Sequence, residues 1–119
     1  ELIQSQAADI VSPDMAKAGG LLEGRRIADF ADMYYMPLAP HNICGPIGTF
    51  AMTHVCAAVP NFLALEFHHL DNALWSDLVK EGPLIVDGHI ATGEKPGLGV
   101  TLDEGVAKEA AKEDLGFFS

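Results

Sequence analysis

Residues 36–66 read MPLAPHNICGPIGTFAMTHVCAAVPNFLALE. Short apolar runs over 35–38 and 62–66 are typical of strands buried within a sheet. Pro46 stands where a helix can begin, and Pro60 stands where a helix must end. This pair predicts a helix over 47–59. Because only a few residues connect these elements, the stretch predicts a strand–helix–strand unit with parallel strands.

The same alternation extends toward the N-terminus. A β-branched run over 9–12 predicts another short strand, and apolar residues at intervals of three to five predict a helix over 21–34. Residues 2–8 are typical of the end of a helix. Residues 1–66 are therefore expected to form a βαβαβ slice of an α/β protein, with apolar strands buried on both faces.

Such a slice is too small to close on itself. Three parallel strands leave two unpaired edges, and a (β/α)8 barrel needs roughly 250 residues, about twice the 119 present. The chain also begins at Glu1 without an initiator methionine. We therefore expect the last third of a barrel, with the rest of the catalytic machinery upstream in a longer protein.

The pattern changes beyond residue 70. A short helix, a β-hairpin that turns at the Asp-Gly pair of residues 87 and 88, and a terminal helix are predicted there. Their ranges are 72–80, 84–91 and 103–114. We expect two parts: residues 1–70 as the last βαβαβ portion of the barrel, and residues 71–119 as a tail.

Charge and composition narrow the class of partner. Seventeen acidic and seven basic residues give a formal charge of −10, and only Arg25 and Arg26 are adjacent cations, which disfavours nucleic acid. No run approaches the roughly 18 apolar residues of a membrane helix, and no signal peptide is visible. We expect a cytoplasmic protein with no membrane partner. Cys44 and Cys56 match no zinc motif and are expected to be reduced thiols, at least one of them buried.

A titratable residue follows each predicted strand of the slice: Asp14, His41 and Glu66. The C-terminal ends of parallel barrel strands form the active site, so we expect these side chains to face one pocket. A carboxylate beside a histidine fixes the imidazole tautomer and raises its basicity, which suits acid–base catalysis. Each residue also has a structural alternative: a turn cap for Asp14, an ordinary loop histidine for His41 and a solvated side chain for Glu66.

Other polar and aromatic residues have simpler interpretations. Lys17 is expected to be structural or at the surface, and Trp75 to anchor the tail rather than to bind a sugar. His68 and His69 are candidates to line the mouth of the pocket. A metal site there is the alternative, and it would need more ligands than these two adjacent imidazoles. His54 is expected at a packing or surface position, and His89 in the hairpin is expected to be exposed.

Four segments resemble motifs of the mandelate racemase subgroup of the enolase superfamily. Ser12-Pro-Asp-Met-Ala-Lys-Ala-Gly-Gly20 is similar to the sixth-strand motif. Leu38-Ala-Pro-His-Asn42 with Gly45-Pro-Ile47 is similar to the seventh-strand motif of its sugar-acid dehydratases, such as galactonate and gluconate dehydratases. Residues 60–66 resemble the eighth-strand segment of the family. Residues 83–100 resemble its C-terminal hairpin and loop. The motifs follow the family order over nearly the whole chain.

This resemblance implies an α/β fold, the C-terminal part of an enolase-type (β/α)7β TIM barrel, whose hairpin and helix tail packs on a capping domain. It implies that Asp14 and His41 form the catalytic dyad. Glu66 is implied to exchange a hydrogen bond with the substrate carboxylate as it becomes an enediolate. The related muconate cycloisomerases have lysine where Asp14 stands, so this residue favours the racemase and dehydratase branch.

The resemblance also implies Mg²⁺, with three acidic ligands upstream of Glu1 and none in this sequence. A divalent cation stabilises the charge that develops when a proton beside a carboxylate is removed. The implied substrate is a sugar acid, an aldonate such as galactonate or gluconate, which is dehydrated to a 2-keto-3-deoxy acid. A homo-oligomer is expected. Two alternatives stay open: a racemase or epimerase of the same superfamily, or a chain with no catalysis of its own.

Overall fold

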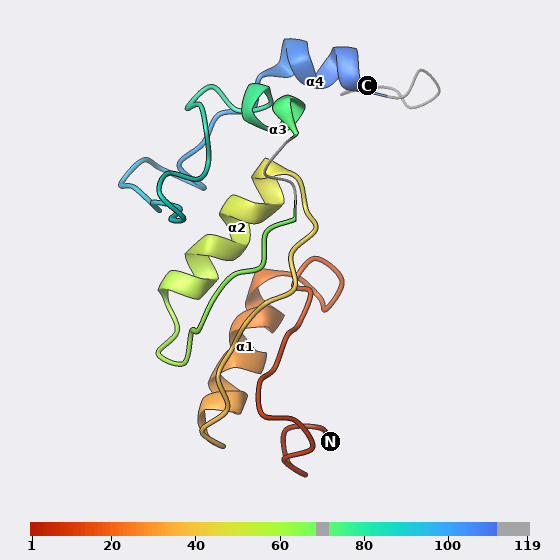
Figure 1. The fold of residues 1–119 in the computed structure, drawn as a ribbon, viewed down its shortest axis with the longest axis vertical. Coiled ribbons are helices and arrows are strands. Elements are labelled where there is room, and N and C mark those ends of the chain that lie inside the picture. The colour runs from red at the N-terminus through yellow and green to blue at the C-terminus, as the bar shows by residue number, and fades with distance from the viewer. Residues whose placement is uncertain (69–71, 112–119) are drawn as a thin grey trace.

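The computed structural model describes residues 1–68 and 72–111, and four helices follow one another within them (Figure 1). They are α1 (Leu21–Asp32), α2 (Pro46–Ala57), α3 (Ala73–Asp77) and α4 (Glu104–Ala110). The first two helices pack together beside three extended segments, while α3 and α4 lie at the end of the molecule opposite the N-terminus. This is the predicted order of elements.

The three extended segments pair in parallel, as predicted, with Leu38 at their centre. Its N–H donates to the carbonyl of Asn61 and its carbonyl accepts from the N–H of Leu63, both at 2.8 Å. On the other side, the N–H of Val11 donates to the carbonyl of Pro37 at 3.0 Å. Each pairing is a single bridge, shorter than the predicted strands, because prolines in and beside these segments supply no N–H to a ladder.

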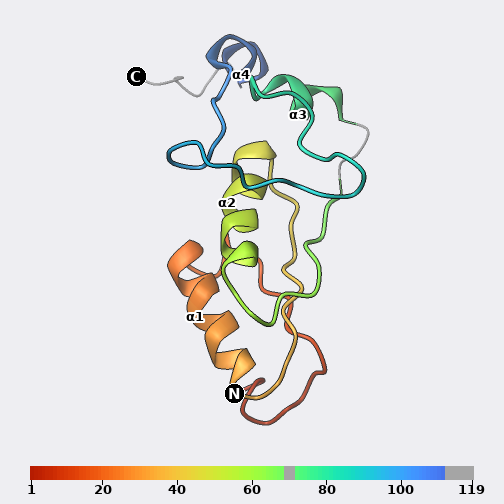
Figure 2. The same cartoon turned by 90° about the vertical axis from the view of Figure 1, so that its left-hand side faces the viewer.

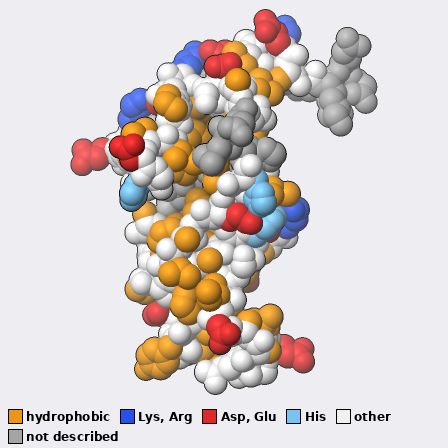
Figure 3. Space-filling view, viewed as in Figure 1, with side chains coloured by type: hydrophobic (Ala, Val, Ile, Leu, Met, Phe, Trp, Pro, Cys, Tyr) orange, Lys and Arg blue, Asp and Glu red, His pale blue; other side chains and the backbone are white. Residues whose placement is uncertain are grey.

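The core lies between the helix pair and the extended segments (Figure 2). Its buried apolar residues are Val11, Met15, Ala28, Ala31, Met36, Leu38, Met52, Val55, Cys56 and Val59. The extended segments are not covered all round, since Ile10, Phe62 and Leu63 are 45%, 42% and 56% exposed. Apolar side chains accordingly lie open on the surface (Figure 3). The apolar runs predicted that the strands are buried on both faces. For this chain by itself, that prediction is wrong.

The dimensions agree with an open slice. The radius of gyration is 15.8 Å, larger than the roughly 13.5 Å of a compact domain of this length. No helix in residues 1–68 and 72–111 is both long and apolar enough to cross a membrane. Cys56 is buried, which raises its pKa to about 11, and Cys44 is partly exposed. Both thiols are free, as predicted.

α1 ends at Asp32, before the predicted end at residue 34. Tyr35 adopts the left-handed conformation, with φ of 58°, and the N–H of Met36 donates to the carbonyl of Ala31 at 3.0 Å. This is a Schellman-type end, in which the left-handed residue is usually glycine. Because Tyr35 rather than glycine takes this position, the sequence pattern carried no signal for the end of the helix.

At the N-terminus, the predicted helix end is a turn. The N–H of Ser5 donates to the carbonyl of Glu1 at 2.9 Å, as it would in a helix. The chain then leaves the helical path at Gln6, whose φ is 50°. One helical bond without a successor does not make a helix.

The predicted hairpin is confirmed. Val86 and His89 exchange two backbone hydrogen bonds, of 3.0 and 2.9 Å. Asp87 and Gly88 between them have φ values of 49° and 75°, and positive φ at both positions is what a type I′ turn requires.

The two tail helices are shorter than predicted. α3 covers only the middle of the range 72–80. α4 begins after Asp103, whose carboxylate accepts from the N–H groups of Gly105 and Val106 at 3.0 and 3.1 Å. Residues 112–114 of the predicted terminal helix lie outside the described residues.

Candidate active site

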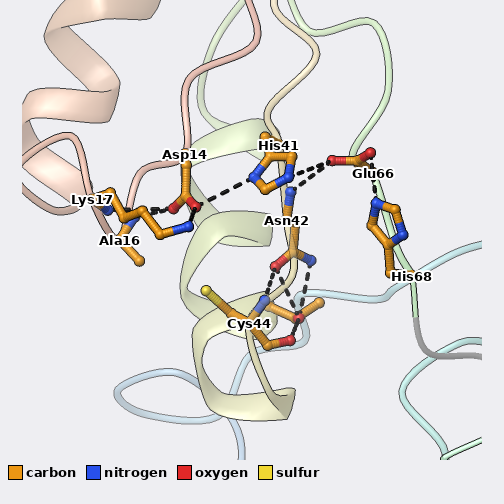
Figure 4. A network of polar contacts seen from close by, with 9 residues as sticks. Asp14, Ala16, Lys17, His41, Asn42, Cys44, Glu66 and His68 are labelled. Carbon is orange, nitrogen blue, oxygen red and sulfur yellow. Dashed lines mark hydrogen bonds and ion pairs between the residues drawn. The ribbon is translucent and has the colours of Figure 1, made fainter.

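The three predicted site residues converge at the C-terminal ends of the extended segments (Figure 4). Nδ1 of His41 lies 3.3 Å from Oδ2 of Asp14. Nε2 on the opposite side of the same ring lies 3.6 Å from Oε2 of Glu66. The predicted convergence is confirmed, and it brings together residues that are 27 and 25 positions apart in the chain.

Asp14 is held by the turn that it begins. Its Oδ1 accepts from the N–H groups of Ala16 and Lys17 at 3.1 and 3.3 Å, and its Oδ2 accepts from the amine of Lys17 at 2.7 Å. The turn-capping interpretation of Asp14 is therefore correct alongside its contact with His41. The amine of Lys17, followed by His41, holds the pKa of this carboxyl below its ordinary value. Asp14 is 12% exposed and ionised near neutral pH.

The ionised Asp14 determines how His41 presents its ring. A neutral imidazole has one donor nitrogen and one acceptor nitrogen. The carboxylate beside Nδ1 makes that nitrogen the donor and leaves Nε2 as the basic atom. A ring protonated at Nε2 then faces the second carboxylate, that of Glu66. Both ring nitrogens of His41 therefore face carboxylate oxygens.

Glu66 is positioned by two further donors. Its Oε1 is paired with Nε2 of His68 at 2.8 Å, and its Oε2 accepts from the backbone N–H of Asn42 at 3.1 Å. Both interactions, with that of His68 the larger, lower the pKa of Glu66. The side chain is 40% exposed, so the solvated interpretation was partly right. His68 lies at the mouth of the site as predicted, whereas His69 lies outside the described residues.

The loop that carries His41 is fixed by a buried amide. The side-chain N–H of Asn42 donates to Oγ1 of Thr49 at 3.0 Å, and its oxygen accepts from the N–H of Cys44 at 3.1 Å. Asn42 and Thr49 are 1% and 0% exposed. Since Thr49 belongs to the first turn of α2, this network ties the loop to the helix.

Lys17 and Asn42 are therefore site neighbours to which the sequence assigned no role in the site, whereas His68 was expected to line its mouth. The signal for Lys17 was its position three residues after Asp14, in a turn that brings the two side chains together. Asn42 stood within the seventh-strand motif, but nothing in the sequence indicates that its side chain turns inward.

Metal-ligating side chains form one group within the described part of the chain: His41, Glu66 and His68. Their ligand atoms lie within 4.8 Å of one another. Mg²⁺ prefers oxygen ligands, and this group offers a single carboxylate. The group formed by His41, Glu66 and His68 therefore does not fit a Mg²⁺ site. The expected position of the Mg²⁺ ligands upstream of Glu1 stays a prediction.

Trp75, two other histidines and a groove lie outside the group formed by His41, Glu66 and His68. The ring of Trp75 meets that of Phe67 edge to face at 5.7 Å, which joins α3 to the third extended segment. Nε2 of His54 is paired with the carbonyl of Leu98 at 2.9 Å, and His89 is exposed as predicted. A groove of about 850 Å³ is lined by α2, by residues 62–65 with Phe67, and by residues 85 and 88–93, and none of the three site residues lines it.

Comparison with known proteins identifies the family of this chain. Residues 1–106 match the family described as enolase C-terminal domain-like. A D-xylonate dehydratase from Haloferax volcanii is 55% identical over 102 residues, which are 86% of this chain and 25% of that protein. The chain thus spans about a quarter of the length of that relative.

Solved structures agree with the family match. A mandelate racemase/muconate lactonizing enzyme-like protein from Rubrobacter xylanophilus is 50% identical with a TM-score of 0.93, over 99% of this chain and 30% of that one. An enolase from Pantoea ananatis, solved with bound D-gluconate and Mg, is 25% identical with a TM-score of 0.82, over 94% of this chain and 27% of that one. These matches confirm the predicted α/β fold class of the TIM-barrel type and the resemblance to mandelate racemase-like enolases. The chain belongs to the enolase C-terminal domain-like family.

Proposed function

We propose that the protein carrying this chain dehydrates a sugar acid, with Asp14 and His41 as the acid–base dyad and Glu66 at the substrate carboxylate. The observation that carries the proposal is the position of His41, whose ring nitrogens lie 3.3 Å from Asp14 and 3.6 Å from Glu66. A histidine whose Nδ1 is oriented by a carboxylate and whose Nε2 faces the open side of the site has the geometry of a general base. The likeness to D-xylonate dehydratase supports the same class of reaction.

Proton transfer begins at the carbon beside the substrate carboxylate. Nε2 of His41 removes that proton, while Asp14 holds Nδ1 as a donor and stabilises the charged ring. The hydroxyl on the neighbouring carbon then leaves as water, and the resulting enol rearranges to a 2-keto-3-deoxy acid. We place the acid that protonates the leaving hydroxyl outside this chain.

Glu66 faces the substrate carboxylate in this proposal. His68 and the backbone of Asn42 favour its ionised form in the described structure. An approaching carboxylate raises the pKa of Glu66 through like-charge repulsion, so Glu66 takes up a proton and donates it in a hydrogen bond. This hydrogen bond strengthens as negative charge gathers on the substrate during proton removal.

The proposal includes Mg²⁺ as the cofactor. When bound, a divalent cation stabilises the negative charge on a carboxylate whose neighbouring carbon loses a proton. We place its acidic ligands outside this chain, because the described residues lack an oxygen ligand set. The Mg present with D-gluconate in the Pantoea ananatis enolase supports this cofactor.

The proposed substrate is an aldonate, such as galactonate or gluconate. D-xylonate in the name of the Haloferax volcanii relative and D-gluconate in the Pantoea ananatis enolase belong to this chemical class. A homo-oligomeric state, a cytoplasmic location and the division into residues 1–70 and 71–119 stay predictions.

The test is an assay of the full-length enzyme with Mg²⁺ and a library of aldonic and aldaric acids. We expect a 2-keto-3-deoxy acid from at least one aldonate. A racemase or epimerase would share the first proton transfer but lose no water. Isomerised acid without any keto product would therefore replace the dehydratase proposal with that alternative.

A further inference from the structure

We propose that His41, Glu66 and His68 form a binding site for a transition-metal cation such as Zn²⁺, separate from the proposed Mg²⁺ site. Two imidazole nitrogens and one carboxylate oxygen lie within 4.8 Å of one another there. Imidazole ligands suit Zn²⁺ and Co²⁺, whereas Mg²⁺ prefers oxygen ligands alone. The chemistry of the cluster therefore selects a different class of ion.

The spacing of the ligand atoms is close to what a tetrahedral ion needs. Zn²⁺ binds nitrogen and oxygen ligands at about 2.0–2.2 Å, so neighbouring ligand atoms on a tetrahedron lie about 3.4 Å apart. Nε2 of His68 is 2.8 Å from Oε1 of Glu66, and Nε2 of His41 is 3.6 Å from Oε2. These two contacts use different oxygens of Glu66, and one ligand atom from each of the three residues lies within 4.8 Å of the others. To bind one ion, the three side chains need to rotate only until their ligand atoms are about 3.4 Å apart.

A second carboxylate supports His41 as a ligand. Oδ2 of Asp14 lies 3.3 Å from Nδ1, on the side of the ring away from the cluster. Metal-ligating histidines commonly donate their other N–H to a carboxylate, which fixes the ring and makes the ligating nitrogen more basic. Asp14 therefore prepares Nε2 of His41 for a cation as well as for a proton.

The cluster is open to an incoming ion. The side chains of His41, Glu66 and His68 are 38%, 40% and 50% exposed. The ion can keep a water molecule as its fourth ligand, as open zinc sites do. The amine of Lys17 lies against Asp14, on the far side of His41 from this cluster, and does not occupy the cation position (Figure 4).

An ion bound here occupies Nε2 of His41, the atom to which the proposed function assigns proton transfer. Zn²⁺ is therefore an inhibitor that acts by taking the lone pair of the base. This inhibition rests on the proposed function, whereas the binding of the ion rests on the geometry of the three ligands.

Binding is tested with the full-length enzyme in excess Mg²⁺, titrated with Co²⁺ and then Zn²⁺. Co²⁺ gives visible absorption bands when imidazoles bind it, and Zn²⁺ that displaces it removes them. The variants are His68→Gln and His89→Gln, of which the second is a control because His89 is exposed in the hairpin, outside the cluster. We expect wild type and His89→Gln to bind alike and His68→Gln to bind at least about tenfold more weakly.

Equal Co²⁺ binding by wild type and His68→Gln, or no binding at all, overturns the site. Inhibition is measured as the ratio of turnover with and without Zn²⁺ in each variant, so an effect of the substitution on turnover itself cancels. Binding that depends on His68 without inhibition supports the site and contradicts the role proposed for His41. An enzyme with no dehydratase activity contradicts the proposed function, while the Co²⁺ spectra still decide the site.

Discussion

Two carboxylates flank the ring of His41, and a neutral imidazole donates to only one of them. The second carboxylate, that of Glu66, faces Nε2, the nitrogen to which one proposal assigns proton transfer and the other a bound cation. A single arrangement of side chains thus leads to both proposals above. Substituting His41 tests its role as the base, and substituting Asp14 tests its role in orienting the ring of His41.

His41→Asn is expected to lower turnover of the full-length enzyme by at least about 10²-fold, because the general base is lost. Asp14→Asn is expected to lower turnover too, because the amide no longer holds the imidazole tautomer. Substrate binding should suffer less than turnover in both variants. Steady-state kinetics on the best aldonate measure this, with His89→Asn as a control at an exposed histidine. Wild-type turnover in both site variants contradicts the dyad.

Lys17 is expected to control the ionisation of Asp14. Its amine is the main reason that the pKa of Asp14 lies below the ordinary value. Lys17→Gln should raise that pKa, so that Asp14 takes up its proton at a higher pH than in wild type when the pH falls. A ¹³C NMR titration of the carboxyl carbon measures the change.

The matched control for Lys17→Gln is Arg25→Gln. Arg25 makes an ion pair of the same length, 2.7 Å, with Asp29 on α1, away from the site. This substitution should leave the titration of Asp14 unchanged. An unchanged titration in Lys17→Gln as well would show that the turn, rather than the amine, holds Asp14 ionised.

At the scale of elements, the site depends on how α2 holds the loop before it. The hydroxyl of Thr49 accepts from the side chain of Asn42 and also lies 3.2 Å from the carbonyl of Cys44. Both Asn42 and Thr49 are fully buried, so their hydrogen bonds have no replacement from water. His41 therefore takes its position from a helix that contributes no side chain to the catalytic group.

Thr49→Val keeps the side-chain shape and removes the hydroxyl. We expect unfolding free energy to fall by about 1–3 kcal/mol, since the buried amide of Asn42 loses its partner. Turnover should fall with it, because the loop that carries His41 loosens. Thr53→Val is the control: its hydroxyl donates to the carbonyl of Thr49 at 2.9 Å, one turn back along the same helix. Urea unfolding of both variants gives the comparison, and equal losses would contradict a special role for Thr49.

At the scale of the whole molecule, the apolar side chains of the extended segments are partly exposed, and the candidate site lies at the C-terminal ends of these segments. The extended segments expose apolar side chains, and the radius of gyration of the chain is 15.8 Å, so the faces of these segments are not fully covered. The three carboxylates expected for Mg²⁺ do not occur together in the part that the structure describes. Proton transfer and charge stabilisation are thus predicted to come from different parts of the protein.

Metal removal tests this division. Chelation with EDTA should abolish turnover of the full-length enzyme, and added Mg²⁺ should restore it, because the cation stabilises the developing charge. Residues 1–119 alone should give no keto acid at any Mg²⁺ concentration. Dehydration by residues 1–119 alone, assayed as for the full-length enzyme, would contradict the placement of the metal ligands outside this chain.

The sequence alone determined the order of the elements and the edge at which the site lies. Helix periodicity, the prolines at residues 46 and 60 and the Asp-Gly turn act over a few neighbouring residues, so α1, α2 and the hairpin could be predicted locally. Parallel strands place their C-terminal ends together, which predicted the meeting of Asp14, His41 and Glu66.

Only the tertiary structure decided which groups complete the site and where the elements end. The pairing of Glu66 with Asn42 joins residues 24 positions apart, and no period in the sequence encodes it. Likewise, Tyr35 ends α1 in a conformation that usually marks glycine. Local patterns fix the path of the backbone over one or two turns. Contacts between distant side chains depend on how whole elements pack, and packing is a property of the folded chain.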